Sequence, residues 1–162
     1  MKQIRLIQAN DQNIWKLLKL EVASNQKDFI ATNTESIIEA YLCLVNHGKV
    51  LPFGVYYDQI PVGFVMIGYG VDEGWKNPPK IAKDNYSIWR FMIDRNYQHQ
   101  GFGKAAMEQV LDMISKKPLG DAEYCYLSYD AENMAAKQFY RSFGFEETGE
   151  YDDGERVAAI RL

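Results

Sequence analysis

The sequence is poor in the residues that build metal centres and covalent cross-links. Its 162 residues include two cysteines and two histidines. Cys43 and Cys125 both lie inside apolar runs, where a thiol behaves as a small buried hydrophobe, and this fits a reducing compartment. His47 and His99 have no cysteine or carboxylate at ligand spacing, so we expect no metal site.

Long apolar segments and an excess of basic charge are also absent. No apolar run approaches the ~18 residues that span a bilayer, and the N-terminus alternates instead of forming the apolar core of a signal peptide. The 18 Lys and Arg residues are outnumbered by 22 Asp and Glu residues. We therefore expect a cytoplasmic protein without general affinity for nucleic acid or anionic membranes. The net charge of -4 is compatible with a cationic substrate, although such a charge also simply keeps a small domain in solution.

The composition is that of an ordinary globular protein, with 47% hydrophobic and 25% charged residues, and predicts one domain over residues 1–162. A first strand is expected at residues 4–9, and Asn10 or Asp11 would cap a helix that carries Ile14 to Val22. Thr34 would cap a second helix that ends near His47. That helix should bury the apolar residues at helical spacing, which are Ile37, Ile38, Tyr41, Leu42 and Val45.

The rest of the chain alternates between strand and helix patterns. Residues 70–85 are rich in Gly and Pro and predict a loop, which is either functional or a tolerated insertion. Asp130 would cap the last helix, and Gly144 would end it. The other expected elements are strands at 51–57, 62–69, 86–94, 124–129, 145–150 and 155–161, and a helix at 101–117. The order β-α-α-β-β-β-α-β-α-β-β predicts an α/β fold, a mixed sheet with helices on both faces.

A glycine-bearing loop joins the strand at 86–94 to the helix that follows. At the start of that helix, unpaired backbone N–H groups and the helix dipole form a site for an anion such as a pyrophosphate. Gly101 and Gly103 would let the anion approach the backbone closely.

Two motifs carry a family resemblance. The run Gln98-x-x-Gly101-x-Gly103 resembles the Gln/Arg-x-x-Gly-x-Gly/Ala signature of the GCN5-related N-acetyltransferase (GNAT) superfamily. Downstream, the run from Asn133 to Phe145 is similar to the second signature of that family, Asn-x-x-Ala-x-x-Phe/Leu-Tyr-x-x-x-Gly-Phe. Two motifs at matching separation are much harder to obtain by chance than one.

The resemblance implies the GNAT-like acyl-CoA N-acyltransferase fold, with acetyl-CoA as co-substrate. The strand at 88–94 would splay from its neighbour and offer backbone groups at Phe91, Met92 and Ile93 to the pantetheine, and one N–H would polarise the thioester carbonyl. The residues that would wrap the pyrophosphate are Gln98, His99, Gln100, Gly101, Phe102, Gly103 and Lys104.

In the family the Asn contacts the pantetheine arm and the Tyr protonates the leaving thiolate, which assigns these roles to Asn133 and Tyr140. The two residues are seven apart, so they would point the same way from one helix. Tyr140 also fits as a core aromatic. Arg95 stands where the family often has Pro, and Gln98 stands where Arg is commoner. Lys104, Lys137 and Arg141 are candidate phosphate partners, and a solvated helix face explains each nearly as well.

The acceptor and the general base are less well defined. Segments 20–29, 61–66 and 89–94 resemble the bacterial spermine/spermidine acetyltransferase branch, which implies a small polyamine acceptor and allows for a homodimer. An amine with a pKa of ~10.4 is almost fully protonated at pH 7, so a carboxylate or water must accept its proton. The candidates are Asp72, Glu73, Glu21 and Asp28, and each fits better as an ordinary surface charge.

Two other functions compete with an acetyltransferase. Gly101-x-Gly103-x-x-Ala106 meets a relaxed dinucleotide fingerprint, with Asp121 or Glu123 near the acidic position, and would suit an NAD-binding oxidoreductase. About six residues separate the strand from Gly101, however, and too little chain remains for a Rossmann sheet. A non-catalytic acyl-CoA sensor would keep the same fold without turnover, and the intact Tyr140 argues against it.

Overall fold

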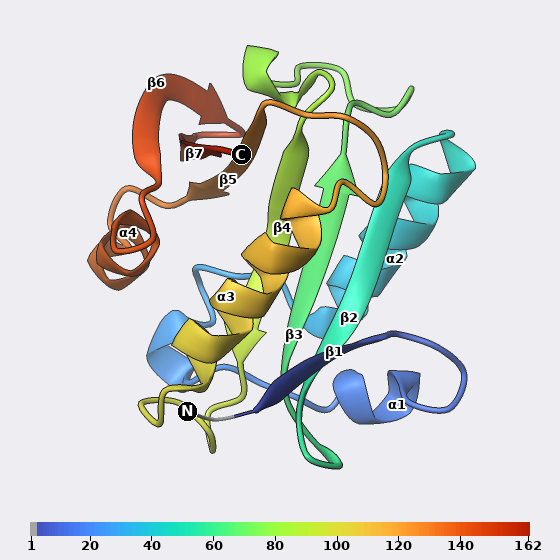
Figure 1. Ribbon diagram of the computed structural model, residues 1–162, viewed down its shortest axis with the longest axis vertical. Coiled ribbons are helices and arrows are strands. Elements are labelled where there is room, and N and C mark those ends of the chain that lie inside the picture. Colours follow the sequence, from blue (N-terminus) through green and yellow to red (C-terminus); the bar gives the residue numbers. More distant parts are fainter. Residues whose placement is uncertain (1–2) are drawn as a thin grey trace.

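A seven-stranded sheet forms the centre of the computed structural model, which describes residues 3–162 (Figure 1). The strand order is β1-β2-β3-β4-β5-β7-β6, in which β4 and β5 are parallel and all other neighbours are antiparallel. This confirms the predicted mixed sheet. The strands are β1 (Ile4–Gln8), β2 (Lys49–Tyr57), β3 (Ile60–Tyr69), β4 (Tyr86–Ile93), β5 (Tyr124–Tyr129), β6 (Glu146–Asp152) and β7 (Glu155–Arg161).

Helices cover both faces of the sheet, and the predicted order of elements is confirmed. On one face α1 and α2 enclose a core around Leu17, Phe64 and Met66. On the other face α3 and α4 enclose a larger core around Met107 and Val110 (Figure 1). The helices are α1 (Ile14–Leu17), α2 (Asn33–Val45), α3 (Phe102–Ser115) and α4 (Met134–Arg141), with 3-10 turns at Ser24–Gln26 and Lys80–Ala82.

The sequence patterns of β3 and α3 explain this layering. Residues 62–68 of β3 are all buried, because the strand is central and covered on both faces. In α3, Ala106, Val110 and Ile114 recur at helical spacing and are fully buried. Burying a side chain such as Val110 or Ile114 stabilises the fold by about 1.5–3 kcal/mol, so these residues attach α3 firmly to the sheet.

The first helix is shorter than predicted. It ends at Leu17 and does not reach Val22. The Glu21 N–H, which would continue the helix, donates instead to Asp94 Oδ2 at 3.0 Å. The Leu17 carbonyl accepts from the Asn33 side chain at 2.8 Å. These two tertiary contacts pull the chain out of the helical path.

The second helix begins at Asn33 with Thr32 as its N-cap, so the predicted cap at Thr34 is wrong. The Thr32 hydroxyl accepts from the Glu35 N–H at 3.1 Å, and the Glu35 carboxylate accepts from the Thr32 N–H at 2.8 Å. This reciprocal capping box requires a Glu or Gln three residues after the cap. Thr32 has Glu35 at that position, whereas Thr34 has Ile37.

The predicted buried face of α2 is also largely wrong. The buried residues are Asn33, Ser36, Ala40 and Cys43. Of the residues expected in the core, Ile37 packs partly against it, whereas the others are between 51% and 66% exposed: Ile38, Tyr41, Leu42 and Val45. Helical spacing fits both faces of this apolar helix. The face with small side chains lies against the sheet, because it allows the closer approach.

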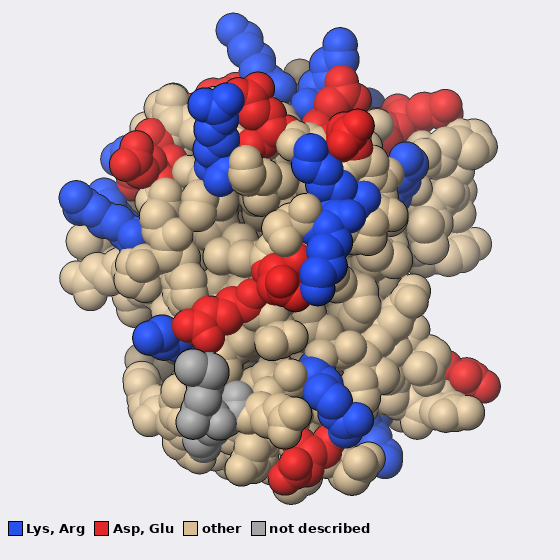
Figure 2. Space-filling model, in the orientation of Figure 1, with Lys and Arg blue, Asp and Glu red and all other residues tan. Residues whose placement is uncertain are grey.

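Charges of both signs are mixed over the surface. On the face that carries α3, Lys and Arg side chains are interspersed with Asp and Glu side chains (Figure 2). In the part of the chain that the structure describes, no helix combines the length and the apolar character needed to cross a bilayer.

Candidate active site

The sheet opens between its two parallel strands. β4 and β5 pair only at Tyr86 with Cys125 and at Ser87 with Tyr126, although both strands continue beyond those residues. On the other side of β4 the register with β3 shifts at Trp89, where an extra residue bulges. A bulge bends its strand, so β4 turns away from β5. The predicted splay of this strand is confirmed.

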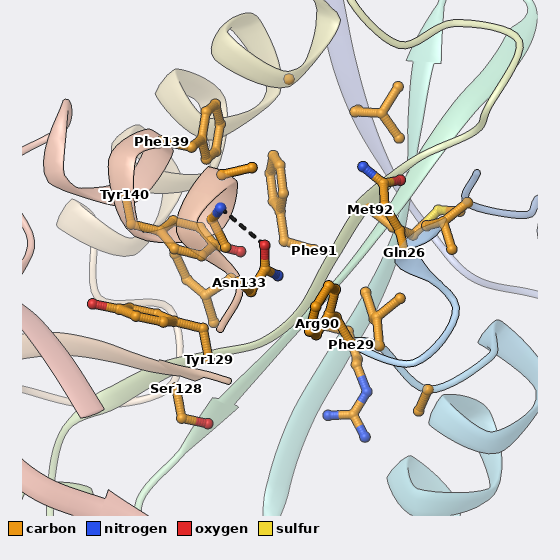
Figure 3. Close-up of a pocket in the computed structure, with 18 of the residues that line it drawn as sticks. Gln26, Phe29, Arg90, Phe91, Met92, Ser128, Tyr129, Asn133, Phe139 and Tyr140 are labelled. Atoms are coloured by element: carbon orange, nitrogen blue, oxygen red, sulfur yellow. Dashed lines mark hydrogen bonds between the residues drawn. The ribbon is translucent and has the colours of Figure 1, made fainter. Parts of the chain in front are cut away.

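A cavity of about 600 Å³ lies in this opening (Figure 3), a volume typical of small-molecule sites. Eight of the predicted site residues line it: Phe91, Met92, Ile93, Gln98, His99, Gly103, Asn133 and Tyr140. Five others do not line it: Gln100, Gly101, Phe102, Lys104 and Lys137. The structure therefore brings together residues from three separate segments of the chain.

The turn before α3 has the geometry of an anion site. Gly101 is the N-cap of α3, has a φ of 85° and supplies no side-chain cap. The N–H of Gly103, in the first turn of the helix, therefore has no capping side chain and can bind a ligand. Gly103 also lines the cavity, and a Cβ there would lie 3.7 Å from Ile93 and from Phe139, an ordinary contact distance. These features fit a phosphate group.

The polar side chains of the turn are mostly engaged within the protein. The Gln98 amide donates to Gln26 Oε1 at 2.7 Å and to the Ile93 carbonyl at 3.0 Å. These bonds hold the turn against β4. Gln100 donates to the Asn96 carbonyl at 3.1 Å. The Phe102 side chain is buried in the core, and Lys104 is exposed.

Lys137 of α4 is engaged with β6. Its ammonium pairs with Glu147 of β6 at 3.1 Å, and the same carboxylate accepts from the Tyr129 hydroxyl at 3.0 Å. In this structure Lys137 therefore ties α4 to β6, and its charge is already paired.

Asn133 is the N-cap of α4, so the prediction that Asp130 caps this helix is wrong. Asn133 Oδ1 accepts from the Ala136 N–H at 3.2 Å, and Asp130 Oδ1 accepts from the Glu132 N–H at 2.8 Å in the turn before it. The cap uses the acceptor of the Asn133 amide, and its NH₂ group faces the cavity (Figure 3). Asn133 thus precedes the helix that carries Tyr140, and both residues still line one cavity.

Tyr140 belongs to the core and to the cavity at once. Its ring centroid lies 5.4 Å from that of Phe139, 6.1 Å from that of Tyr129 and 6.1 Å from that of Phe145. Burial raises the pKa of the Tyr140 hydroxyl, and the charge of Glu155 raises it further. The hydroxyl therefore stays protonated at neutral pH and can act as a proton donor.

The four carboxylates predicted as candidate bases lie in different parts of the structure. Asp28 lines the cavity, and Asp72 lines a second cavity on the other side of β4. Glu21 and Glu73 line neither cavity: Glu21 pairs with Arg95 at 3.6 Å, and Glu73 shares a hydrogen bond with His47 at 3.1 Å.

Sequence reasoning missed Ser128, Arg90 and Glu155, which also line the first cavity. Ser128 Oγ donates to Glu155 Oε1 at 3.3 Å. Burial raises the pKa of the Glu155 carboxyl, and the Ser128 hydrogen bond and the Arg90 charge lower it by less. Glu155 follows an Asp-Asp-Gly turn, and such a sequence is typical of an exposed hairpin. Only the pairing of β7 with β5 brings it to the opening.

The sheet topology argues against the dinucleotide-binding alternative. That fold uses a mostly parallel sheet built from two βαβαβ halves. Here β4 and β5 form the single parallel pair among residues 3–162, and they separate after two residue pairs.

Known proteins are similar to this chain in sequence and in fold. The chain is 31% identical to a spermine/spermidine N(1)-acetyltransferase of Bacillus subtilis (strain 168), over 98% of this chain and 99% of that protein. A crystal structure of an aminoglycoside acetyltransferase AAC(6')-Ib in complex with coenzyme A has a TM-score of 0.76 at 15% identity, over 98% of this chain and 95% of that one. A PaiA N-acetyltransferase of Thermoplasma acidophilum in complex with coenzyme A has a TM-score of 0.67 at 14% identity, over 99% of each chain.

The family assignment covers most of the described residues. Residues 14–145 match the Acetyltransferase (GNAT) family, and this range includes the opening between β4 and β5, the turn before α3, and α4 with Asn133 and Tyr140. Sequence, fold and site geometry thus agree, and the chain belongs to the acetyltransferase (GNAT) family as an acetyl-CoA-dependent N-acetyltransferase.

Proposed function

We propose that the protein acetylates a primary amine of a polyamine such as spermidine or spermine. The observation that carries this proposal is the 31% identity to a spermine/spermidine N(1)-acetyltransferase over nearly the full length of both chains. A match of that extent includes the segments that surround the cavity as well as the shared cofactor motifs. The amine would attack the thioester directly.

Acetyl-CoA supplies an activated acetyl group, and the described residues suit its binding. The N–H groups at the start of α3 would hold the pyrophosphate. The amide of Asn133 and the backbone of β4 from Phe91 to Ile93 would hold the pantetheine. The Tyr140 hydroxyl, which its raised pKa keeps protonated at neutral pH, would donate its proton to the leaving sulfur.

The test is release of free thiol from acetyl-CoA with a panel of amines. Spermidine and spermine should give the highest kcat/KM, above a monoamine, an aminoglycoside and a peptide with a free N-terminus. Turnover confined to the peptide or to the aminoglycoside would overturn the polyamine assignment. Acetyl-CoA binding in calorimetry without turnover of any amine would favour an acyl-CoA sensor.

A further inference from the structure

A second cavity of about 450 Å³ adjoins the first one. It lies between α2, β3, the β6–β7 turn and the other side of β4. Five residues line both cavities, and they lie where β4 and β5 separate: Ile88, Trp89, Arg90, Ser128 and Glu155. The two cavities are therefore adjacent and share one wall.

The lining of this second cavity is strongly acidic. Two cationic side chains, Arg90 and Lys49, face five carboxylates, which are Glu39, Asp72, Asp152, Asp153 and Glu155. Arg90 is paired with Glu39 at 2.6 Å, and Lys49 donates to the Leu119 carbonyl at 2.9 Å. Among residues 3–162, Asp152, Asp153 and Glu155 form no ion pair. Asp152 and Glu155 are partly buried, and partial burial of a carboxylate without an ion pair is unfavourable until a cation joins it.

Aromatic side chains complete the lining. They are Tyr69, Trp75, Trp89 and Tyr126. Aromatic faces attract ammonium groups and also pack against methylene chains. Carboxylates combined with aromatic faces suit a flexible molecule in which ammonium groups alternate with short hydrocarbon segments.

We infer that this second cavity is the acceptor site, that Glu155 accepts the proton of the reacting amine, and that Asp152 binds a further ammonium group of the same molecule. The inference rests on the proposed function for the identity of the acceptor. Glu155 is the one carboxylate among residues 3–162 that lines both cavities. Asp28 reaches the first cavity alone, and Asp72 the second alone.

One acetyl transfer forms an N–C bond and breaks a C–S bond. The ammonium group gives one proton to the Glu155 carboxylate, and the freed nitrogen lone pair forms the N–C bond to the acetyl carbon. The C–S bond breaks, and its electron pair stays on sulfur, which takes the proton of the Tyr140 hydroxyl. The second proton of the amine nitrogen leaves to solvent and restores Tyr140 by exchange. Glu155 thus acts at the wall between the two cavities, and Tyr140 acts from the first cavity.

Burial supports Glu155 as a base, because it raises the pKa of this carboxyl and so strengthens its affinity for a proton. Several polar groups face Glu155. They are Ser128 of β5, Asp130 directly after β5, Arg90 of β4, Asp152 of β6 and Tyr140 of α4. The hydrogen bond from Ser128 and the charge of Arg90 lower the pKa of Glu155, whereas the charges of Asp152 and Asp130 raise it.

The first experiment compares Glu155→Gln with Glu146→Gln. Glu146 is an exposed residue of β6, so its variant removes the same charge outside both cavities. Glu155→Gln should lower kcat by ~10²–10⁴-fold with the KM for acetyl-CoA unchanged. Protonation of Glu155 should lower the wild-type rate at acidic pH, and this decline should be absent from the variant. Glu146→Gln should match the wild type. Equal kcat values and pH profiles in both variants would overturn the role of Glu155.

Thermal unfolding separates chemistry from folding. The folded-state pKa of Glu155 is raised above its usual value, so the ionised carboxylate destabilises the folded protein at neutral pH. Glu155→Gln removes that charge and keeps an acceptor for Ser128, and its Tm should equal or exceed that of the wild type. A Tm well below it would mean that the lost activity reflects damage to the fold, and the role would be rejected on that result.

The second experiment tests the binding of the distant ammonium. Asp152→Asn should raise the KM for spermidine about tenfold, the effect of losing ~1.4 kcal/mol, and leave the KM for a monoamine unchanged. Equal effects on both amines would overturn the role of Asp152. If the protein acetylates only an amine of another class, the proposed function fails, and Glu155→Gln measured with that amine still decides the proton acceptor.

Discussion

At the scale of single residues, Tyr140 combines packing and proton donation in one side chain. Replacing it with Phe keeps the ring that contacts Phe139 and Tyr129 and removes only the hydroxyl. We expect Tyr140→Phe to lower kcat by ~10²–10⁴-fold, with unchanged Tm and unchanged acetyl-CoA affinity. Steady-state kinetics together with calorimetry check this. Full turnover in the variant would remove Tyr140 from the mechanism.

Gly103 tests the anion site at the same scale. A Cβ would meet Ile93 and Phe139 at the ordinary contact distance of 3.7 Å, so Gly103→Ala should fold normally. The two methyl groups of Val extend further into the space where the phosphate would lie. Gly103→Val should weaken acetyl-CoA binding at least about tenfold, or ~1.4 kcal/mol, in a calorimetric titration. Equal affinity of the Val variant and the wild type would mean that the turn binds no phosphate.

At the scale of elements, the start of α4 joins helix stability to cofactor binding. Asn133→Ala removes the cap that Ala136 N–H requires, and such a loss destabilises proteins by about 0.5–2 kcal/mol. Asn133→Asp keeps the acceptor and loses the NH₂ group. We therefore expect denaturant unfolding to show lower stability for Ala alone, whereas both variants bind acetyl-CoA more weakly. Wild-type affinity in the Asp variant would contradict the contact with pantetheine.

Elements with a single strong pattern were predicted well from the sequence. The predicted strand at 124–129 coincides with β5, and the predicted helix at 101–117 differs from α3 (Phe102–Ser115) by one residue at its start and two at its end. The motif around Gly101 correctly placed a turn at the start of a helix. In α2 both faces are apolar, so spacing alone could not show which face packs against the sheet. The early end of α1 depends on Asp94, which lies far away in the sequence.

The residues on the acceptor side of the site could not be predicted from the sequence for the same reason. Asp152 and Glu155 surround a turn whose residues resemble any solvated hairpin. Their position at the opening follows from the order β5-β7-β6 at one end of the sheet. Cofactor residues, in contrast, lie within short motifs on consecutive elements. Long-range strand pairing therefore separates what the sequence predicts from what only the structure places.

At the scale of the whole molecule, buried thiols and phenols make the fold sensitive to alkali. Burial raises the pKa of Cys43 to about 11 and that of Tyr129 to about 12, and it also raises the pKa values of Tyr126 and Tyr140. Unfolded Cys and Tyr titrate near ~8.5 and ~10. The unfolded chain therefore loses protons first, and the free energy of unfolding should fall as pH rises above about 8.5.

Urea unfolding at a series of pH values checks this expectation. The midpoint should decline from about pH 8.5 toward pH 11, and the decline should be smaller for Tyr129→Phe, which lacks one of the titrating groups. A constant midpoint over this range would contradict it. The single domain over residues 1–162 and the homodimer stay predictions, and light scattering at several protein concentrations would test the homodimer.

β4 and β5 pair at only two positions in the described residues, and this should affect hydrogen exchange in the free protein. Past Ser87 and Tyr126 the two strands no longer pair with each other, so part of the β4 backbone lacks a strand partner on that side. Amide protons there should exchange with deuterium quickly in the free enzyme. If the pantetheine arm occupies the gap, it takes the place of the missing strand, and saturating coenzyme A should slow this exchange selectively in β4.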